Sequence, residues 1–132
     1  RYLCHKHGLT EWYPAEPKHR ARVEQWLDWN QSRLSPAVID IVFNTLFAGP
    51  RKDERAISRG EAKLRELGPL LDAGLAAYDY LTGPKPTIAD LSVASNLFQL
   101  SLAKATLPGA RIAAWYQRMH ALDGFRKSLP PA

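Results

Sequence analysis

Thr87 opens the stretch that most restricts what this chain can fold into. The Thr87 hydroxyl can accept a hydrogen bond from the backbone N–H three residues on, where Asp90 can bond back to the N–H of Thr87. This pattern predicts a capping box, and it places a carboxylate at the positive end of the helix dipole. Apolar residues then follow nearly all the way round the helix: Leu91, Val93, Ala94, Leu97, Phe98, Leu100 and Leu102. Such a helix is expected in the middle of a protein. We therefore interpret Thr87 and Asp90 as structural residues.

Helical spacing also dominates the rest of the chain. We expect helices over 18–34, 36–47, 53–81, 87–102 and 110–122, and a short turn over 125–129 after a break at Gly124. Ser35 is expected to cap the second of these helices, with Pro36 in its first turn. The β-branched run that follows would suit a strand by propensity, but a lone strand would have no partner. Pro69 should kink or split the long helix.

These elements predict an all-α fold of five or six helices around the buried helix that starts at Thr87. The 132 residues are enough for one domain with a real core, and 45% of them are hydrophobic. Lys and Arg exceed Asp and Glu by 18 − 13 = 5, but the positive charges are scattered. A nucleic-acid binder would need a basic stripe with stacking aromatics. We therefore expect no nucleic-acid partner.

The first eight residues read as the end of a helix, with basic side chains and a terminal Gly8. A helix with an end and no beginning suggests a piece of a longer chain. Cys4, His5 and His7 do not form a metal site by this pattern, because two His separated by one residue face different ways on a helix. A single cysteine fits a reducing compartment. Neither a signal peptide nor a membrane span is expected, so the sequence predicts a cytoplasmic protein.

Several motifs, in this order, resemble cytosolic glutathione transferases of the theta-like classes. Arg1-Tyr2-Leu3 is similar to the end of the last helix of their thioredoxin-like domain, and Trp12-Tyr13-Pro14-Ala15 to the interdomain linker. Residues 20–29 resemble the first helix of the C-terminal domain. Thr87-Ile88-Ala89-Asp90 resembles the capping box of its central helix, and residues 115–119 its penultimate helix. The resemblance divides the chain into a preceding-domain end (1–8), a linker (9–17) and a helical C-terminal domain (18–132).

The resemblance implies a function for the complete protein, namely attack of the glutathione thiolate on a hydrophobic electrophile in detoxification. Glutathione would be a co-substrate, and no cofactor is implied. The Ser, Tyr or Cys that favours the thiolate belongs to the thioredoxin-like domain, so no catalytic residue is assigned to this chain. The helical domain would supply a dry apolar wall and orient the electrophile. The resemblance also implies a homodimer.

By the same resemblance, Ser35, Ile39, Phe43 and Gln99 fall at electrophile-binding positions. Some relatives carry an arginine for anionic substrates at the position of Ser35. Ser32 matches a position that can contact glutathione across the dimer. Residues 32, 35, 39 and 43 are three and four apart, so they can share one helix face. Core packing is the competing interpretation for Ile39 and Phe43, and local bonding to the backbone is the one for the two serines.

Two other functions remain open at this point. The first is a non-catalytic interaction module, because the same helical fold occurs in relatives that dock onto partners. Its candidate contact patch is Tyr2 with Trp26 and Trp29. The second is a helical nucleic-acid binder, which the scattered charge disfavours.

Overall fold

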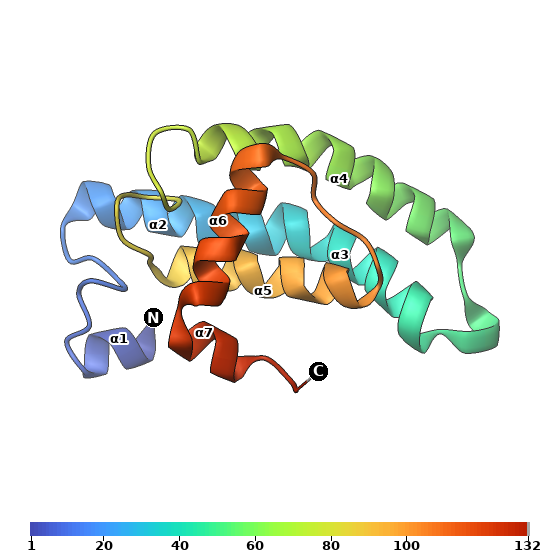
Figure 1. Cartoon of the computed structure of the whole chain (residues 1–132), viewed down its shortest axis with the longest axis horizontal. Helices are drawn as coiled ribbons and strands as arrows, with labels where there is room; N and C mark the ends of the chain where they lie inside the picture. The colour runs from blue at the N-terminus through green and yellow to red at the C-terminus, as the bar shows by residue number, and fades with distance from the viewer. Residues whose placement is uncertain (132) are drawn as a thin grey trace.

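The regular structure of residues 1–131, the part of the chain that the computed structural model describes, is entirely helical (Figure 1). The α-helices are α1 (Tyr2–Lys6), α2 (Pro17–Trp29), α3 (Ser35–Val42), α4 (Glu54–Gly74), α5 (Ile88–Leu102), α6 (Ala110–Ala121) and α7 (Asp123–Ser128). Three short helical turns accompany them: the π-helical η1 (Asn30–Leu34) and η2 (Phe43–Phe47), and the 3-10 turn η3 (Gly49–Arg51). The predicted all-α fold class is confirmed, and the run after Ser35 is helical rather than a strand.

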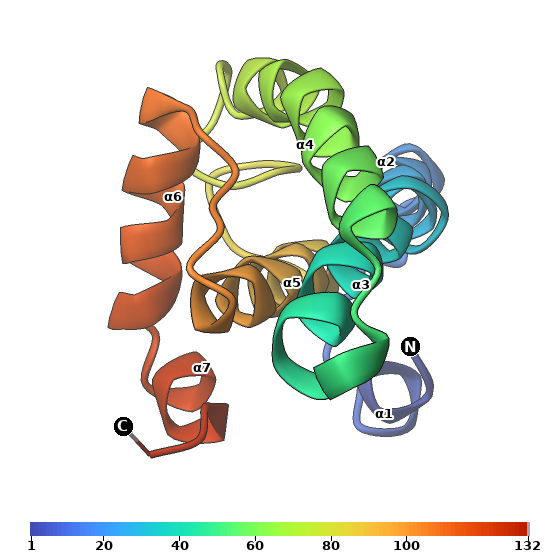
Figure 2. The ribbon, with the colours of Figure 1, turned by 90° about the vertical axis from the view of Figure 1, so that its right-hand side faces the viewer.

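Helix α5 lies at the centre of the bundle, as the sequence predicts. It packs against α2 and α3 on one side and against α6 on the other (Figure 2). Its buried positions are Ala89, Asp90, Val93, Ala94, Asn96, Leu97 and Leu100. The expectation of apolar burial all round is too broad, because Leu102 is 49% exposed and Ser95 and Gln99 face solvent. We call the exposed side of α5 that carries Ser95, Gln99 and Leu102 its outer face.

The capping box that begins α5 is formed as predicted. Thr87 caps the helix, and Asp90 Oδ2 accepts a 2.9 Å hydrogen bond from the backbone N–H of Thr87. The second oxygen, Oδ1, accepts at 2.9 Å from the N–H of Leu81. The carboxyl is fully buried, and this burial raises the pKa of Asp90, against the lowering effect of its N–H donors. Trp12 attaches the linker of residues 9–17 to the start of α5, since the Trp12 carbonyl accepts a 3.0 Å hydrogen bond from the N–H of Ile88.

A nearly continuous helical path runs from α2 through η1 and α3 to η2. The expected break at Ser35 is wrong, because Ser35 and Leu34 both have α-helical torsions and no side chain caps α3. The Ser35 N–H instead bonds five residues back, to the carbonyl of Asn30. This wide turn lies next to Pro36, which has no N–H to give. The turn lets the helix pass the proline without ending.

Helix α4 differs from the expectation at two places. It continues through Pro69 without splitting, and it ends at Gly74 rather than near residue 81. Tyr78, expected on the buried stripe, is 49% exposed in the loop that follows. Tertiary bonds hold residues 79–81 outside the helix, since the N–H of Leu81 goes to Asp90 and the Asp79 carbonyl accepts from the Arg118 guanidinium. Those backbone groups are therefore not available to extend the helix.

The C-terminal helices complete the core. Ile112, Trp115 and Met119 lie inward on α6, as predicted from their spacing. The break between α6 and α7 falls at Leu122, whose backbone is extended. Gly124 was expected to break the helix, but it lies inside α7.

Candidate functional site

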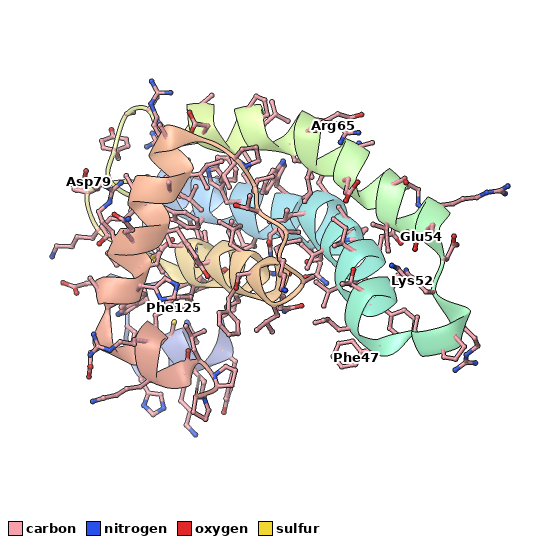
Figure 3. All side chains as sticks on the ribbon, turned by 45° about the vertical axis from the view of Figure 1, so that its right-hand side comes forward. Phe47, Lys52, Glu54, Arg65, Asp79 and Phe125 are labelled. Atoms are coloured by element: carbon pink, nitrogen blue, oxygen red, sulfur yellow. The ribbon has the colours of Figure 1, made fainter. Side chains whose placement is uncertain are left out.

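An exposed apolar strip follows α3 and η2. Ile39, Phe43 and Phe47, four residues apart, are 60%, 53% and 71% exposed, and we call these three residues the apolar wall. Figure 3 shows the Phe47 side chain standing away from the ribbon at the end of this stretch. The core-packing interpretation of Ile39 and Phe43 is therefore wrong for this domain. The opposite side of α3 packs into the core through Val38 and Ile41.

Ser35 lies one helical turn before the wall and is held from α5. Its Oγ accepts a 2.9 Å hydrogen bond from Nδ2 of Asn96. The same Nδ2 donates at 2.8 Å to Oδ1 of Asn30. Asn30 and Asn96 are 6% and 8% exposed, whereas Ser35 is half-buried. The two asparagines therefore form a buried polar link between η1 and α5, with Ser35 at its open end.

Gln99 lies on the exposed side of α5, three residues after Asn96. α5 runs in the same direction as the α2–α3 path beside it (Figure 1). Three residues advance a helix by about 4.5 Å. Gln99 therefore lies further along the bundle than the Asn96–Ser35 bond, toward the level of Ile39.

A hollow of about 430 Å³ lies beside the outer face of α5. Its lining includes Leu91 and Ser95 from α5, Trp12 from the linker and Phe125 from α7. Gln99 follows Ser95 at the next helical turn, so the hollow and Gln99 share one face of α5. The surface of the hollow itself is mainly apolar.

Ser32 lies apart from the other candidates. Its hydroxyl donates to the Asp28 carbonyl at 2.7 Å, which is the local backbone bond considered for it. Ser32 lines a groove of about 480 Å³ between α3 and α4, which we call the α3–α4 groove. In this groove Asp40 binds Arg59 through two hydrogen bonds of 2.9 and 3.0 Å, and this contact raises the pKa of Arg59. Ser32 thus faces α4, whereas Ser35 faces α5, so the expectation of one shared face is wrong.

The wide turn η1 accounts for this separation. A π-helical turn holds more residues than the α-helical turn assumed from the sequence, so side chains before and after it diverge. Ser32 lies within η1 and Ser35 follows it.

The aromatic patch proposed for an interaction module is only partly exposed. Trp26 and Trp29 contact each other edge to face, with ring centroids 5.2 Å apart, and both pack against the core. Trp26 also fills the space beside Gly74. Only Tyr2, at 71% exposure, stands fully on the surface.

The amino-terminal Cys4, His5 and His7 do not converge, because Cys4 is buried while both histidines are exposed. Across residues 1–131, no three His, Cys, Asp or Glu side chains lie close enough together to hold a metal ion. None of the helices within that same range is long and apolar enough to cross a membrane.

The sequence reasoning did not identify Asn96 as a site residue. Its signal is visible in retrospect: a polar amide one helical turn from the apolar Val93 and Leu100, at a position that helical spacing turns toward α2 and α3. Asn30 carries the same signal within the apolar stripe of the first long helix.

Comparison with known proteins places this geometry in a family. Residues 54–118 match the family model for the glutathione S-transferase C-terminal domain. Glutathione S-transferase GstB of Escherichia coli is 30% identical over 131 residues, a match that spans 96% of this chain and 62% of that protein. The chain has the fold of a glutathione transferase C-terminal domain. Mouse glutathione S-transferase theta-1 is also 30% identical, with 93% of this chain and 55% of the relative covered.

Solved glutathione transferase structures have the same fold. The theta class enzyme of Xanthomonas axonopodis pv. citri, solved with glutathione bound, superposes with a TM-score of 0.83 at 24% identity over all of this chain and 70% of that one. Human glutathione-S-transferase T1-1 in its apo form gives 0.80 at 27% identity, covering 91% of this chain and 54% of that one. The chain thus spans about 55–62% of the curated relatives' length, and the resemblance to theta-like glutathione transferases is confirmed.

Proposed function

We propose that this domain forms the electrophile-binding half of a glutathione transferase. The complete protein conjugates the glutathione thiolate to hydrophobic electrophiles, as a cytoplasmic detoxification enzyme. The domain contributes no nucleophile and no catalytic acid or base. Its part is to remove the electrophile from water and to orient it toward the thiolate.

The observation that carries this proposal is the exposure of the apolar wall. A large exposed apolar strip on an otherwise well-packed helix is typical of a surface that binds a ligand or another domain. Ile39 and Phe43 would contact the electrophile directly. Ser35 and Gln99 would offer it polar contacts at the edge of the wall, from α3 and α5 respectively.

A homodimer belongs to the same proposal. The α3–α4 groove carries charges of both signs, including the Asp40–Arg59 pair, and such a surface suits a polar contact with a second copy. Ser32 at this groove would reach glutathione bound to the other subunit. Residues 1–8 would end the thioredoxin-like domain, and residues 9–17 would link the two domains.

The experiment compares Phe43→Ala with Leu70→Ala in the complete protein. Leu70 is 57% exposed on α4, away from the wall, and so serves as a matched control for loss of exposed apolar surface. We expect Phe43→Ala to raise the KM for apolar electrophiles by about tenfold, because covering a Phe side chain is worth roughly 1.5–3 kcal/mol and half of this one is already covered. The KM for glutathione should stay unchanged, and Leu70→Ala should alter neither constant.

Two results would contradict the proposal. One is a complete protein that neither binds glutathione nor conjugates any member of a broad electrophile panel. The other is an equal effect of both substitutions. A non-catalytic interaction module is the alternative in the first case, and co-purification of a stoichiometric partner that is lost on replacement of Tyr2 would support it.

A further inference from the structure

We propose that Asn96, braced by Asn30, fixes the Ser35 hydroxyl as a hydrogen-bond donor toward the bound electrophile. This inference rests on the proposed function. It assigns two positioning residues and names a substrate preference, for electrophiles that carry an acceptor oxygen such as a nitro or carbonyl group beside an apolar body.

The first step is the direction of the bond between the two residues. An amide nitrogen only donates, so the 2.9 Å contact from Asn96 Nδ2 to Ser35 Oγ occupies a lone pair of the hydroxyl. The hydroxyl proton is left for another acceptor. Asn96 cannot reverse this role easily, because its Nδ2 also donates to Asn30 Oδ1 at 2.8 Å. Asn30 therefore sets the orientation of the Asn96 amide.

The second step is where the Ser35 proton goes. Serines inside helices commonly donate to the carbonyl four residues earlier. Ser32 and Ser95 do this, with bonds of 2.7 Å to the carbonyls of Asp28 and Leu91. Within residues 1–131, Ser35 makes no such bond, and its one side-chain contact is the bond it accepts from Asn96. Its proton is thus available on the open side of the residue.

The third step is what lies on that open side. Ser35 is half-buried at the base of the apolar wall, one turn from Ile39 and two turns from Phe43. A ligand covering the wall would exclude water from this hydroxyl. Leaving a polar group without a partner in such a place is unfavourable, so a ligand that supplies an acceptor is preferred over one that does not.

The buried network also explains why two asparagines are placed in the core. A buried amide is tolerated where its hydrogen bonds are made, and each added polar group there specifies one arrangement of its neighbours. Here that arrangement ties η1 to α5 and presents a single donor to the surface. The network therefore acts on the ligand through Ser35 and does not touch it.

The test uses two isosteric substitutions in the complete protein, Asn96→Asp and Asn30→Asp. Asp at position 96 cannot donate, so the Ser35 hydroxyl would turn inward and give its proton to the new carboxylate. Asp at position 30 still accepts from Asn96, so the Ser35 proton keeps its outward direction. Both variants place one carboxylate in the same buried pair, and a purely structural role would make them behave alike.

The readout is the affinity for two probes, S-benzylglutathione and S-(4-nitrobenzyl)glutathione. It is measured by titration of each variant. We expect Asn96→Asp and Ser35→Ala to weaken the nitrobenzyl probe by about three- to tenfold relative to the benzyl probe, the usual range for one hydrogen bond. Two variants should keep the wild-type ratio of the two affinities, Asn30→Asp and Ser35→Thr, which keeps a hydroxyl. The control Ser101→Ala, at a serine whose hydroxyl donates to the Phe98 carbonyl, should also keep it.

An unchanged ratio in Ser35→Ala would overturn the inference, and this variant decides the matter even if Asn96→Asp does not fold. Equal changes of the ratio in Asn96→Asp and Asn30→Asp would also overturn it. Failure of the wild-type protein to bind either probe is a different result, because it would contradict the proposed function itself.

Discussion

Trp115 donates a hydrogen bond of 2.9 Å from its indole Nε1 to Oδ1 of Asp90, and so ties the middle of α6 to the first turn of α5. Both side chains are fully buried. The Asp90 carboxylate also accepts from the backbone N–H groups of Leu81 and Thr87, so three N–H donors depend on it. The cap of the central helix thus also joins α5, α6 and the loop before α5.

We expect Asp90→Ala to cost at least about 3 kcal/mol in the free energy of unfolding, because each buried donor left without a partner costs roughly 1–3 kcal/mol. Asp90→Asn should cost about 1–2 kcal/mol, since its one oxygen can keep Leu81 and Trp115 while Thr87 loses its acceptor. Urea unfolding measures both. Asp79→Asn is the control, because Asp79 binds Arg118 through its backbone carbonyl, which the substitution keeps. Equal stability of Asp90→Ala and wild type would contradict the bridging role.

Glu16 makes the stability of α2 depend on acid pH. Its two carboxylate oxygens accept from the backbone N–H groups of Lys18 and His19, at 3.0 and 2.7 Å, and these bonds lower the pKa of Glu16 below its ordinary 4.5. A lowered pKa in the folded state stabilises the protein above the unfolded pKa, and this contribution is lost as pH falls through the folded value.

We therefore expect the difference in melting temperature between wild type and Glu16→Ala to be largest near neutral pH and to shrink below about pH 4.5. Glu61→Ala, on the outside of α4, controls for the loss of an exposed glutamate and should show no such trend. A difference that stays constant from pH 7 to pH 3 would mean that the carboxylate does not act as a cap.

Gly60 allows α3 and α4 to approach closely. A Cβ at this position would lie 2.8 Å from Cγ1 of Ile41 and 2.9 Å from the Ala37 carbonyl oxygen. Gly60→Ala should destabilise the domain by about 1–3 kcal/mol, as overpacking of a core does. Gly124→Ala, where nothing lies within 4 Å, should instead stabilise α7 by up to about 1 kcal/mol. Chemical denaturation of the two variants should give changes of opposite sign.

Arg118 holds the loop between α4 and α5. Its guanidinium donates twice to the Asp79 carbonyl, at 3.1 and 2.8 Å. In Arg118→Ala we expect faster chymotrypsin cleavage after Tyr78, which is exposed in this loop, while global stability falls by about 1–2 kcal/mol. Arg118→Lys should give an intermediate rate because it keeps one donor. Unchanged cleavage in Arg118→Ala would show that the loop is held by Asp90 alone.

The sequence was sufficient for those parts of the fold that depend on local signals. Thr87 and Asp90 specify a helix start through their own side chains, and Ile112, Trp115 and Met119 specify a buried face through their spacing. The end of α4 could not be predicted in this way, because the side chains that bind the backbone of residues 79 and 81, the donor Arg118 and the acceptor Asp90, lie on other elements. Pro69 suggested a break that the surrounding helix overrides.

The candidate site was predicted less completely, for a related reason. Ile39 and Phe43 were placed on a face by spacing, and their exposure agrees with a binding surface. Ser32 was assigned to the same face because an α-helical turn was assumed where a π-helical one occurs. Asn96 has a role that appears only when α5 is laid against η1, a contact between residues 66 positions apart.

The second π-helical turn, η2, offers a simple way for the sequence to change the side chain at the end of the apolar wall. Its closing bond runs from the Ala48 N–H to the Phe43 carbonyl, five residues back. Deleting one residue between them would restore an ordinary helical turn and rotate the side chains that follow within η2, such as Phe47, by about 100°, while the connection before α4 takes up the change. The buried residues before the turn, such as Val38, would keep their places. The loss of a single codon here could therefore exchange Phe47 for another side chain at the end of the wall while the helical bundle stays intact.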